Sequence, residues 1–254
     1  MRFSIAADEE TGVATLIAGV LAERGHEVVP ISRATGVDVI TGTGLDAALQ
    51  GVEVVVDAAT GPSAEQQPAT DFFVTAAHTL QKAGVRAGVR EAVVVSIIGT
   101  DRFAGGYGAA KVAHEQTWRS GPIPVRVVRA AQFHEFVAQL LEWGGRGDVV
   151  AVPEMRTQIV AARAVADVIA DVVEADAADP GAGVTETIEV AGPREEDLVA
   201  LATELAARRG DPATVEAVRN PGDLDAEMQA TGGLLPGPGA RLVGPTFRQW
   251  LDAE

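Results

Sequence analysis

Short apolar runs alternate with amphipathic stretches over the first two thirds of the chain. Runs typical of buried strands lie at residues 3–6, 27–31, 52–56, 91–98 and 124–128. Apolar positions at helical spacing lie at residues 13–24, 45–49, 72–82 and from residue 107 onward, and Gly84 marks the expected end of the third stretch. This alternation predicts an α/β fold with a Rossmann-like, doubly wound parallel sheet.

The last third of the chain is less regular. Its apolar spacing predicts helices at residues 164–173, 196–209 and 247–251, and glycine-rich or proline-rich segments predict loops at 143–148, 175–183 and 232–239. We therefore expect a Rossmann-like dinucleotide-binding core over residues 1–150. Residues 151–254 are expected to complete the sheet and to form a small C-terminal substrate lobe.

The composition narrows the classes of partner. The 254 residues carry a formal net charge of −16 with no offsetting basic stripe, which argues against a nucleic-acid partner. No apolar run reaches membrane-spanning length and the amino terminus enters a strand at once, so we expect a cytoplasmic protein without a membrane partner. Because the chain has no cysteine and no metal-ligand spacing, we expect no metal. The partner that we expect is a small-molecule substrate. The sequence does not indicate an oligomeric state.

The loop after the first strand stands where a phosphate-binding loop is expected. Such a loop uses glycines, so that backbone N–H groups and the next helix can approach a pyrophosphate. Here Thr11 and Gly12 turn the chain, and the acidic residues Asp8, Glu9 and Glu10 precede them. Two interpretations are open: a tolerated surface loop with a weakened cofactor site, or a site closed to dinucleotides because its own carboxylates occupy the helix N-terminus.

Two further strand ends carry candidate cofactor-binding residues. Arg33 follows the second strand, where an arginine suits the 2′-phosphate of NADP, although a solvated loop arginine is the alternative. Asp57 and Ala58 open the small-residue loop 57–62 after the third strand. In open α/β sheets, ligands bind on this carboxyl-terminal side of the strands.

A candidate proton-transfer pair follows the fourth strand. Tyr107 and Lys111 are four residues apart, which places them on one face of a helix. An ammonium group there lowers the pKa of the phenol, so that the phenol can donate or accept a proton. Ser96 adds a lone hydroxyl inside the preceding apolar run. The alternatives are an ordinary surface pair and a serine bonded to backbone.

Polar residues after the fifth strand are candidates for the substrate side of the site. Gln132, His134 and Glu135 are expected near the ligand-binding edge of the sheet. A histidine with a pKa near neutrality can move a proton without a cofactor, whereas a pocket-lining role is the alternative for His134. Phe133 and Phe136 are expected to pack in the core or to line an apolar substrate pocket.

Several strings of the sequence carry a family resemblance; they lie at residues 24–29, 32–38, 54–57, 96–101, 106–111, 128–136 and 188–193. Together they resemble the atypical short-chain dehydrogenase/reductase superfamily, and within it the NmrA-like proteins. The resemblance is strong from residue 1 to about residue 168 and looser beyond. It implies a Rossmann-like fold, an NAD(P) cofactor and hydride transfer. It also implies that Tyr107 is the acid/base, that Lys111 supports it and holds the nicotinamide ribose, and that Ser96 polarises the substrate. The loop 6–14 departs from the family's glycine-rich pattern because it keeps a single glycine, Gly12.

Three functions remain open at this stage. The first is an NAD(P)H-dependent oxidoreductase acting on a small carbonyl or quinone-like compound. The second is a redox-silent isomerase, dehydratase or cyclase that transfers protons through Tyr107, Ser96 or His134. The third is a non-catalytic sensor of a nucleotide or metabolite. The acidic loop predicts weak or absent dinucleotide binding.

Overall fold

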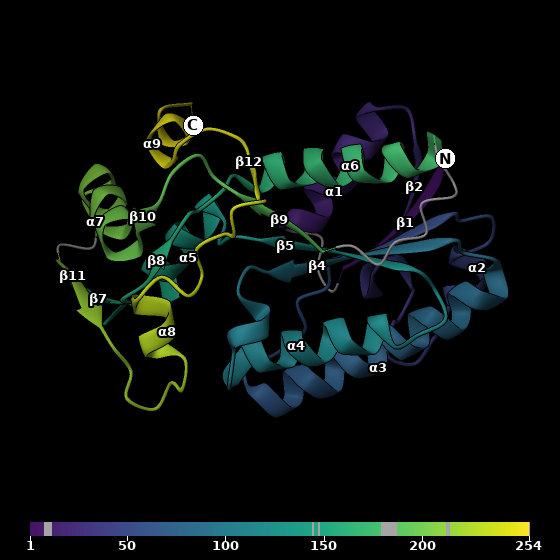
Figure 1. The fold of residues 1–254 in the computed structure, drawn as a ribbon, viewed down its shortest axis with the longest axis horizontal. Helices are drawn as coiled ribbons and strands as arrows, with labels where there is room; N and C mark the ends of the chain where they lie inside the picture. Colours follow the sequence, from purple (N-terminus) through teal and green to yellow (C-terminus); the bar gives the residue numbers. More distant parts are fainter. Residues whose placement is uncertain (8–11, 144, 147, 179–186, 212–213, 254) are drawn as a thin grey trace.

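A computed structural model describes residues 1–7, 12–143, 145–146, 148–178, 187–211 and 214–253 of the chain. Within these residues, seven strands form one parallel sheet in the order β12-β9-β5-β4-β3-β1-β2 (Figure 1). They are β1 (Arg2–Ala6), β2 (Glu27–Ile31), β3 (Val54–Asp57), β4 (Glu91–Ile97), β5 (Val125–Ala130), β9 (Thr187–Ala191) and β12 (Arg241–Leu242). Because the chain leaves β1 first toward β2 and then crosses back to β3, the sheet is doubly wound. The predicted Rossmann-like fold is confirmed.

Helices cover both faces of this sheet (Figure 1). One face carries α1 (Val13–Glu23) and α6 (Ala162–Ala178), and the other carries α2 (Leu45–Ala48), α3 (Gln66–Ala87) and α4 (Gly106–Arg119). Ile17 and Ile169 belong to the first core, whereas Leu80 and Trp118 belong to the second. All four residues of β3 are buried, as expected for an inner strand with a helical layer on each side.

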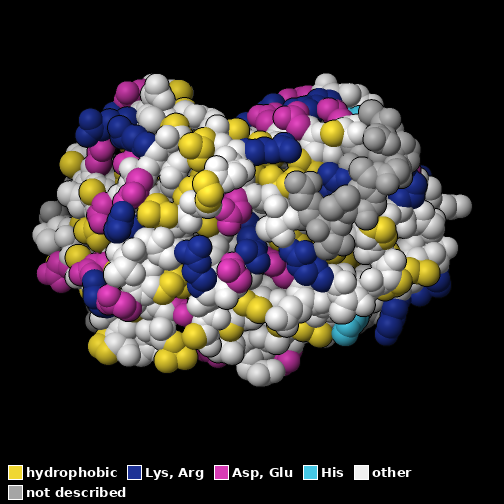
Figure 2. All heavy atoms as spheres, in the orientation of Figure 1, with side chains coloured by type: hydrophobic (Ala, Val, Ile, Leu, Met, Phe, Trp, Pro, Cys, Tyr) yellow, Lys and Arg dark blue, Asp and Glu magenta, His cyan; other side chains and the backbone are white. Residues whose placement is uncertain are grey.

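A second lobe lies at one end of the sheet in Figure 1. It contains α5 (His134–Trp143), α7 (Leu198–Arg209), α8 (Ala226–Ala230) and α9 (Phe247–Ala253), together with β6 (Gly145–Arg146), β7 (Val149–Pro153), β8 (Arg156–Thr157), β10 (Glu196–Asp197) and β11 (Thr214–Val218). In it β7 pairs with β6 and β11, and β8 pairs with β10. Figure 2 shows a notch between this lobe and the sheet domain. Two 3₁₀ turns, η1 (Arg33–Thr35) and η2 (Thr100–Arg102), follow β2 and β4.

Several predicted element boundaries are wrong, among them three at glycine-containing segments. The helix expected to stop at Gly84 continues to Ala87 and ends where Gly88 adopts the left-handed conformation (φ +77°). A Cβ on Gly84 would lie 2.7 Å from Ile123 Cδ1. This glycine therefore lies inside the helix, where it lets the Ile123 side chain pack closely against α3, and it does not end the helix. The loop expected at 175–183 starts later, because α6 extends to Ala178, and residues 179–183 lie outside the described part of the chain.

The third concerns the glycine-rich turn expected at 143–148. Trp143 ends α5, and residues 145–146 form β6, which pairs with β7. Glycine is compatible with a short strand when a neighbouring strand supplies the pairing, so composition alone misassigned this stretch. Gly144 and Gly147 lie outside the described residues. Among the helices of the described residues, none is long and apolar enough to cross a membrane.

Candidate active site

The carboxyl ends of β1 to β4 lie along one edge of the parallel sheet and bring most of the predicted site residues to it. Gly12 follows β1, Arg33 follows β2, Ala58 follows β3, and Ser96 lies near the end of β4. Thr11, together with the acidic residues before it, lies outside the described residues. This edge is where open α/β sheets bind their ligands.

The helix that carries Tyr107 and Lys111 is fastened at its start by residues from other elements. Gly105 immediately precedes α4 and has no side chain that could cap the helix. Its backbone N–H donates to the Asp225 carboxylate at 3.0 Å. The N–H of Ala104 donates to the same carboxylate at 2.8 Å, and that of Gly106 donates to the Gln66 side chain at 3.1 Å. The bond from Gly106, the first residue of α4, satisfies one of the N–H groups that a helix start leaves without an intrahelical partner. The two bonds to Asp225 fix the segment that leads into the helix.

Tyr107 and Lys111 lie one turn apart on α4 and share a neighbour, the ring of Phe73 on α3. The Tyr107 ring packs edge-on against Phe73, with centroids 5.7 Å apart, and the Lys111 Nζ lies 4.5 Å from the centroid of the same ring. The Tyr107 hydroxyl donates to the backbone carbonyl of Thr60 at 3.0 Å, in the loop after β3. The structure therefore brings the predicted pair together at the edge where β3 ends.

Lys111 extends inward from this point and is almost fully buried. Its Nζ donates to the Val95 carbonyl of β4 at 2.8 Å and lies 3.1 Å from His114 Nδ1. His114 Nε2 in turn lies 2.8 Å from Asp57 Oδ2, which also accepts a 2.8 Å hydrogen bond from the Trp118 indole. Lys111, His114 and Asp57 thus form one continuous chain of hydrogen bonds in the interior.

The charge states along this chain follow from its surroundings. Burial by itself raises the pKa of Asp57, but the neighbouring His114 and Lys111 outweigh it and hold that pKa below its ordinary value. Burial and the Lys111 charge lower the pKa of His114, against the opposing effect of Asp57. Both shifts are downward, which favours a carboxylate at Asp57 and a neutral imidazole at His114. We take Lys111 in its ordinary ammonium form. Since a carboxylate only accepts and an ammonium only donates, His114 donates from Nε2 and accepts at Nδ1.

A second polar group lies beside the first and includes Ser96. The Ser96 hydroxyl donates to Glu115 Oε1 at 2.6 Å, and Arg129 binds both Glu115 oxygens at 3.0 and 2.9 Å. Burial raises the pKa of Glu115, but the hydrogen bonds from Arg129 and Ser96 outweigh it and lower that pKa. Since the Ser96 hydrogen is directed to Glu115, the substrate-polarising role of this serine stays a prediction.

His134 lies in a different environment from the Tyr107–Lys111 pair. Its ring is fully buried at the start of α5, with centroids 5.5 Å from Phe247 and 5.4 Å from Trp250 of α9. Neither ring nitrogen makes a well-formed hydrogen bond within the described residues. Burial lowers the pKa of His134 to about 4, and the Ile159 carbonyl opposes this only in part. A catalytic role for His134 stays a prediction.

The other predicted substrate-side residues lie where the sheet meets the second lobe. The Gln132 side chain accepts a hydrogen bond from the Thr157 hydroxyl, and Phe133 forms a bridge to Val160. Glu135 and Phe136 are half-buried in the first turn of α5. Phe136 packs against the core of the second lobe, as does Phe103 from the segment before α4. Their contact with a substrate stays a prediction.

The candidate cofactor positions at β1 and β2 are compatible with a phosphate-bearing ligand. Gly12 has φ +84° and ψ −156°, a conformation that only glycine adopts readily, and among the described residues nothing lies within 4 Å of a Cβ placed there. The first turn of α1 contains no acidic residue. Arg33 is exposed in η1, a turn that Ser32 and Thr35 hold by reciprocal hydrogen bonds. These three features provide backbone space, a helix N-terminus and a cation.

Sequence reasoning missed two residues of this region. His114 follows Lys111 by three positions, so helical spacing places it on the same face, and that signal was available. Asp225 lies 120 residues from Gly105 in a chain segment with no pattern that predicts contact with α4. No sequence signal identifies it.

The sheet order, with helices on both faces, defines a Rossmann-like fold. Solved structures agree over nearly the whole chain. An NAD-dependent NDP-hexosamine 5,6-dehydratase involved in tunicamycin biosynthesis is 16% identical, with a TM-score of 0.67 over 100% of this chain and 99% of that one. The UDP-N-acetylglucosamine 4-epimerase from Bacillus cereus is 14% identical, with a TM-score of 0.67 over 99% and 94%.

A short-chain dehydrogenase/reductase superfamily protein from Agrobacterium tumefaciens, solved with bound NAD, is 18% identical, with a TM-score of 0.65 over 99% and 95%. No family model and no curated protein matches the sequence. At these identities the comparisons show the fold that this chain shares with those enzymes.

Proposed function

We propose that this protein is an NAD(P)H-dependent oxidoreductase that reduces a small carbonyl or quinone-like compound. The observation that carries the proposal is the placement of Tyr107 and Lys111 together at the ligand-binding edge of a doubly wound sheet. The three compared structures share this fold, and two of them are an NAD-dependent dehydratase and a protein solved with bound NAD. The strings that resemble NmrA-like proteins support the same class at a finer level.

The described residues at the edge fit the proposed cofactor. The backbone at Gly12 and the N-terminus of α1 would hold the pyrophosphate, Arg33 would pair with a 2′-phosphate, and Ala58 would lie beside the adenosine half. Arg33 thus supports NADP over NAD. Asp57 was expected here too, but its carboxylate is buried and bonded to His114 and Trp118, so in this proposal it acts from the interior.

In this proposal Tyr107 handles the proton and Lys111 supports it. A reduced nicotinamide cofactor, when bound, would supply the hydride that the substrate carbon accepts. The Tyr107 hydroxyl gives its proton to the substrate oxygen, which takes up the electron pair of the former carbon–oxygen π bond. The phenolate left behind is stabilised by the neighbouring Lys111 charge. Phe103 and Phe136, both half-buried, are proposed as apolar contacts for the substrate.

Cofactor titration and turnover test this function. We expect NADPH to bind more tightly than NADH, because Arg33 would pair with the 2′-phosphate. Both should bind weakly, because the acidic residues Asp8, Glu9 and Glu10 precede Gly12. Arg33→Ala should remove the preference for NADPH. With a panel of small aldehydes, ketones and quinones, Tyr107→Phe should lower kcat by about 10²–10⁴-fold while NADPH binding persists. Tyr107→Phe with unchanged kcat would contradict the proposal.

A redox-silent enzyme on the same scaffold is the second candidate. It is favoured by one observation: Lys111 is nearly buried, and its ammonium is bonded to Val95 and His114 rather than exposed toward a ribose. Absence of dinucleotide binding, with a cofactor-free isomerisation or dehydration lost in Tyr107→Phe, would support this function instead. Dinucleotide binding without any turnover would support the sensor function.

A further inference from the structure

We propose that Asp57 and His114 form a positioning pair, which holds Lys111 as a fixed ammonium ion beside Tyr107 and so sets the ionisation of the Tyr107 phenol from inside the protein. The inference rests on the proposed function only in taking Tyr107 as the proton-transfer group. Nothing in the sequence pattern of the Tyr–Lys motif requires this pair. It is an assignment from the geometry of this chain.

The first support is the continuity of the hydrogen bonds. Asp57 at the end of β3 binds His114, and His114 binds Lys111, at 2.8 and 3.1 Å. The imidazole is fully buried and the carboxylate is 1% exposed, so neither touches solvent or can reach a substrate directly. Both therefore act through Lys111.

The second support is charge balance in a dry interior. A buried ammonium ion is costly unless an opposite charge or good acceptors surround it. Lys111 has the Val95 carbonyl and His114 as acceptors, the Phe73 ring at 4.5 Å, and the Asp57 charge beyond His114. Asp57 thus supplies the negative charge that balances Lys111, and no anionic group of a ligand is required for it.

The third support is the way the imidazole is held. His114 stacks on Phe73 with centroids 4.7 Å apart, so its plane is fixed by packing as well as by hydrogen bonds. The charged groups that act on it are Lys111, Asp57 and Glu115, all from β3 and α4. From α3 and β4 it meets Phe73 and, through Lys111, the Val95 carbonyl. A neutral histidine between two opposite charges fixes the direction of both hydrogen bonds.

This proposal has a test that needs neither cofactor nor substrate. Tyr107 is the single tyrosine of the chain, so the ultraviolet absorbance of phenolate during a pH titration reports Tyr107 alone. Asp57→Asn should move the titration midpoint to higher pH by about one unit. Without the Asp57 carboxylate, Lys111 keeps its proton less strongly and is less fixed in position, so it stabilises the phenolate less. A carboxylate acting directly on the phenol would give the opposite sign, since its removal favours phenolate.

His114→Phe keeps the ring that stacks on Phe73 and removes both hydrogen bonds, so it should also move the midpoint upward. Trp118→Phe is the matched control, because it removes a hydrogen bond to the same Asp57 oxygen without touching Lys111. It should lower the thermal stability and leave the midpoint in place. In a Lys111→Met background, Asp57→Asn should cause no further upward movement.

Nitrogen NMR of the wild-type histidines provides a measurement that does not depend on any variant folding. His114 should remain neutral, with hydrogen on Nε2, from neutral pH down to well below the ordinary histidine range. A midpoint that falls or stays fixed in Asp57→Asn, or a His114 that protonates near neutral pH, would overturn the proposal. Failure to bind NADPH would overturn the oxidoreductase function and leave this result intact, so the two failures are distinguishable.

Discussion

The carboxylate of Asp225 accepts a hydrogen bond from the backbone N–H of Gly105, although the two residues are 120 positions apart. Asp225 is 3% exposed and lies at the start of α8 in the second lobe, whereas Gly105 immediately precedes the helix that carries Tyr107. The second lobe therefore holds the start of the Tyr107 helix directly.

Asp225→Ala should leave the N–H groups of Ala104 and Gly105 without their acceptor. Gly105 is buried whereas Ala104 is exposed, so the cost comes mainly from the unsatisfied Gly105 donor. One such donor costs about 1–3 kcal/mol, so the free energy of unfolding should fall by at least 1 kcal/mol. Chemical denaturation measures this loss. Asp225→Asn keeps one acceptor oxygen and should lose less.

Asp223→Ala is the matched control, since Asp223 binds the backbone N–H of Asp225 rather than α4. We expect Asp225→Ala, and not Asp223→Ala, to lower turnover, because only Asp225 holds the segment before the Tyr107 helix. If both variants lowered stability and turnover equally, the contact with α4 would have no special effect on Tyr107.

The burial of His134 predicts an acid-sensitive fold. The pKa of His134 is about 4 in the folded chain against an ordinary value of 6.5, so between these two pH values the unfolded chain binds a proton that the folded chain excludes. Stability is fully present above pH 6.5 and falls as the pH drops toward 4. The total effect is at most about 3.5 kcal/mol, at roughly 1.4 kcal/mol per pH unit.

His134→Phe should remove this part of the pH dependence while it preserves the ring contacts with Phe247 and Trp250. Urea unfolding at neutral and at mildly acidic pH measures the difference between the two slopes. His78 is exposed on α3, so His78→Phe is the matched control for replacing an imidazole by a phenyl ring. A slope in His134→Phe equal to that of the wild type would show that other groups cause the acid sensitivity.

The sheet and its helices could be predicted because their signals are local. Buried strands such as β3 contain an apolar run, Val54 to Val56 in that strand, and helices such as α1 show apolar positions at helical spacing. Gly84 misled the prediction because glycine has two uses: it ends helices, and it also lets a helix approach a neighbour closely. Only the position of Ile123, 39 residues further along the chain, distinguishes them.

The candidate site was predictable in its parts and not in its connections. Spacing alone brings Tyr107 and Lys111 to one helical face. The direction of the Lys111 side chain depends on Asp57 and Val95, which belong to two different strands, and no local pattern contains that information. Ser96 was identified as an unusual hydroxyl in an apolar run, but its partner Glu115 lies 19 residues away. Long-range pairings of polar groups require the fold.

Removing the carboxylate of Glu115 should be among the costly substitutions in this protein. Arg129 is only 15% exposed and binds both Glu115 oxygens. Glu115→Ala therefore leaves a largely buried guanidinium, and among the described residues Asp101 is its remaining charged partner. Breaking a buried ion pair in this way costs about 3–5 kcal/mol. Glu115→Gln retains one acceptor and should cost less. Denaturant unfolding measures both losses.

Arg119 provides the comparison for this prediction, since its guanidinium lies 3.7 Å from Glu115 and is 30% exposed. Arg119→Met should therefore cost well under the loss in Glu115→Ala. Equal losses would indicate that packing, rather than the buried charge of Arg129, determines the effect.

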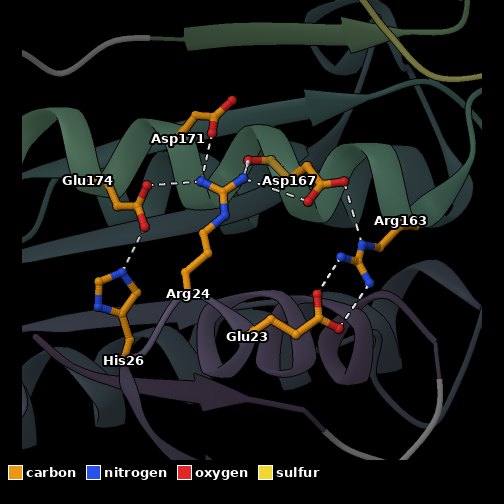
Figure 3. Close-up of polar contacts among 7 residues, drawn as sticks. All are labelled: Glu23, Arg24, His26, Arg163, Asp167, Asp171 and Glu174. Carbon is orange, nitrogen blue, oxygen red and sulfur yellow. Dashed lines mark hydrogen bonds and ion pairs between the residues drawn. The ribbon is translucent and has the colours of Figure 1, made fainter.

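The seam between α1 and α6 is held by an ion-pair network that should be sensitive to salt. Figure 3 shows Arg24 extending between carboxylates of α6, with Nη1 at 2.7 Å from Asp171 and 2.9 Å from Glu174. His26 binds the other oxygen of Glu174 at 2.8 Å. Beside them Arg163 pairs with Glu23, and Figure 2 shows the resulting interleaved charges over this edge of the molecule.

Arg24→Met keeps most of the apolar stem and removes these pairs, so at low ionic strength the free energy of unfolding should fall by about 1 kcal/mol. Raising the salt to roughly 1 M shortens the screening length to about 3 Å and should shrink that difference. Arg163→Met is the control: Arg163 is 49% exposed against 29% for Arg24, so its loss should be smaller at every salt concentration.

The same network determines the direction in which the free energy of unfolding changes with pH. The hydrogen bond from His26, with further support from Arg24, lowers the pKa of Glu174 from its ordinary 4.5. Its stabilising contribution is therefore present above pH 4.5 and is lost as the pH falls through the lowered value. Arg24→Met should reduce this acid-dependent loss, which unfolding at low ionic strength and a series of acidic pH values measures. A difference between wild type and Arg24→Met that grows with added salt would contradict an electrostatic origin, because screening weakens attraction between exposed charges.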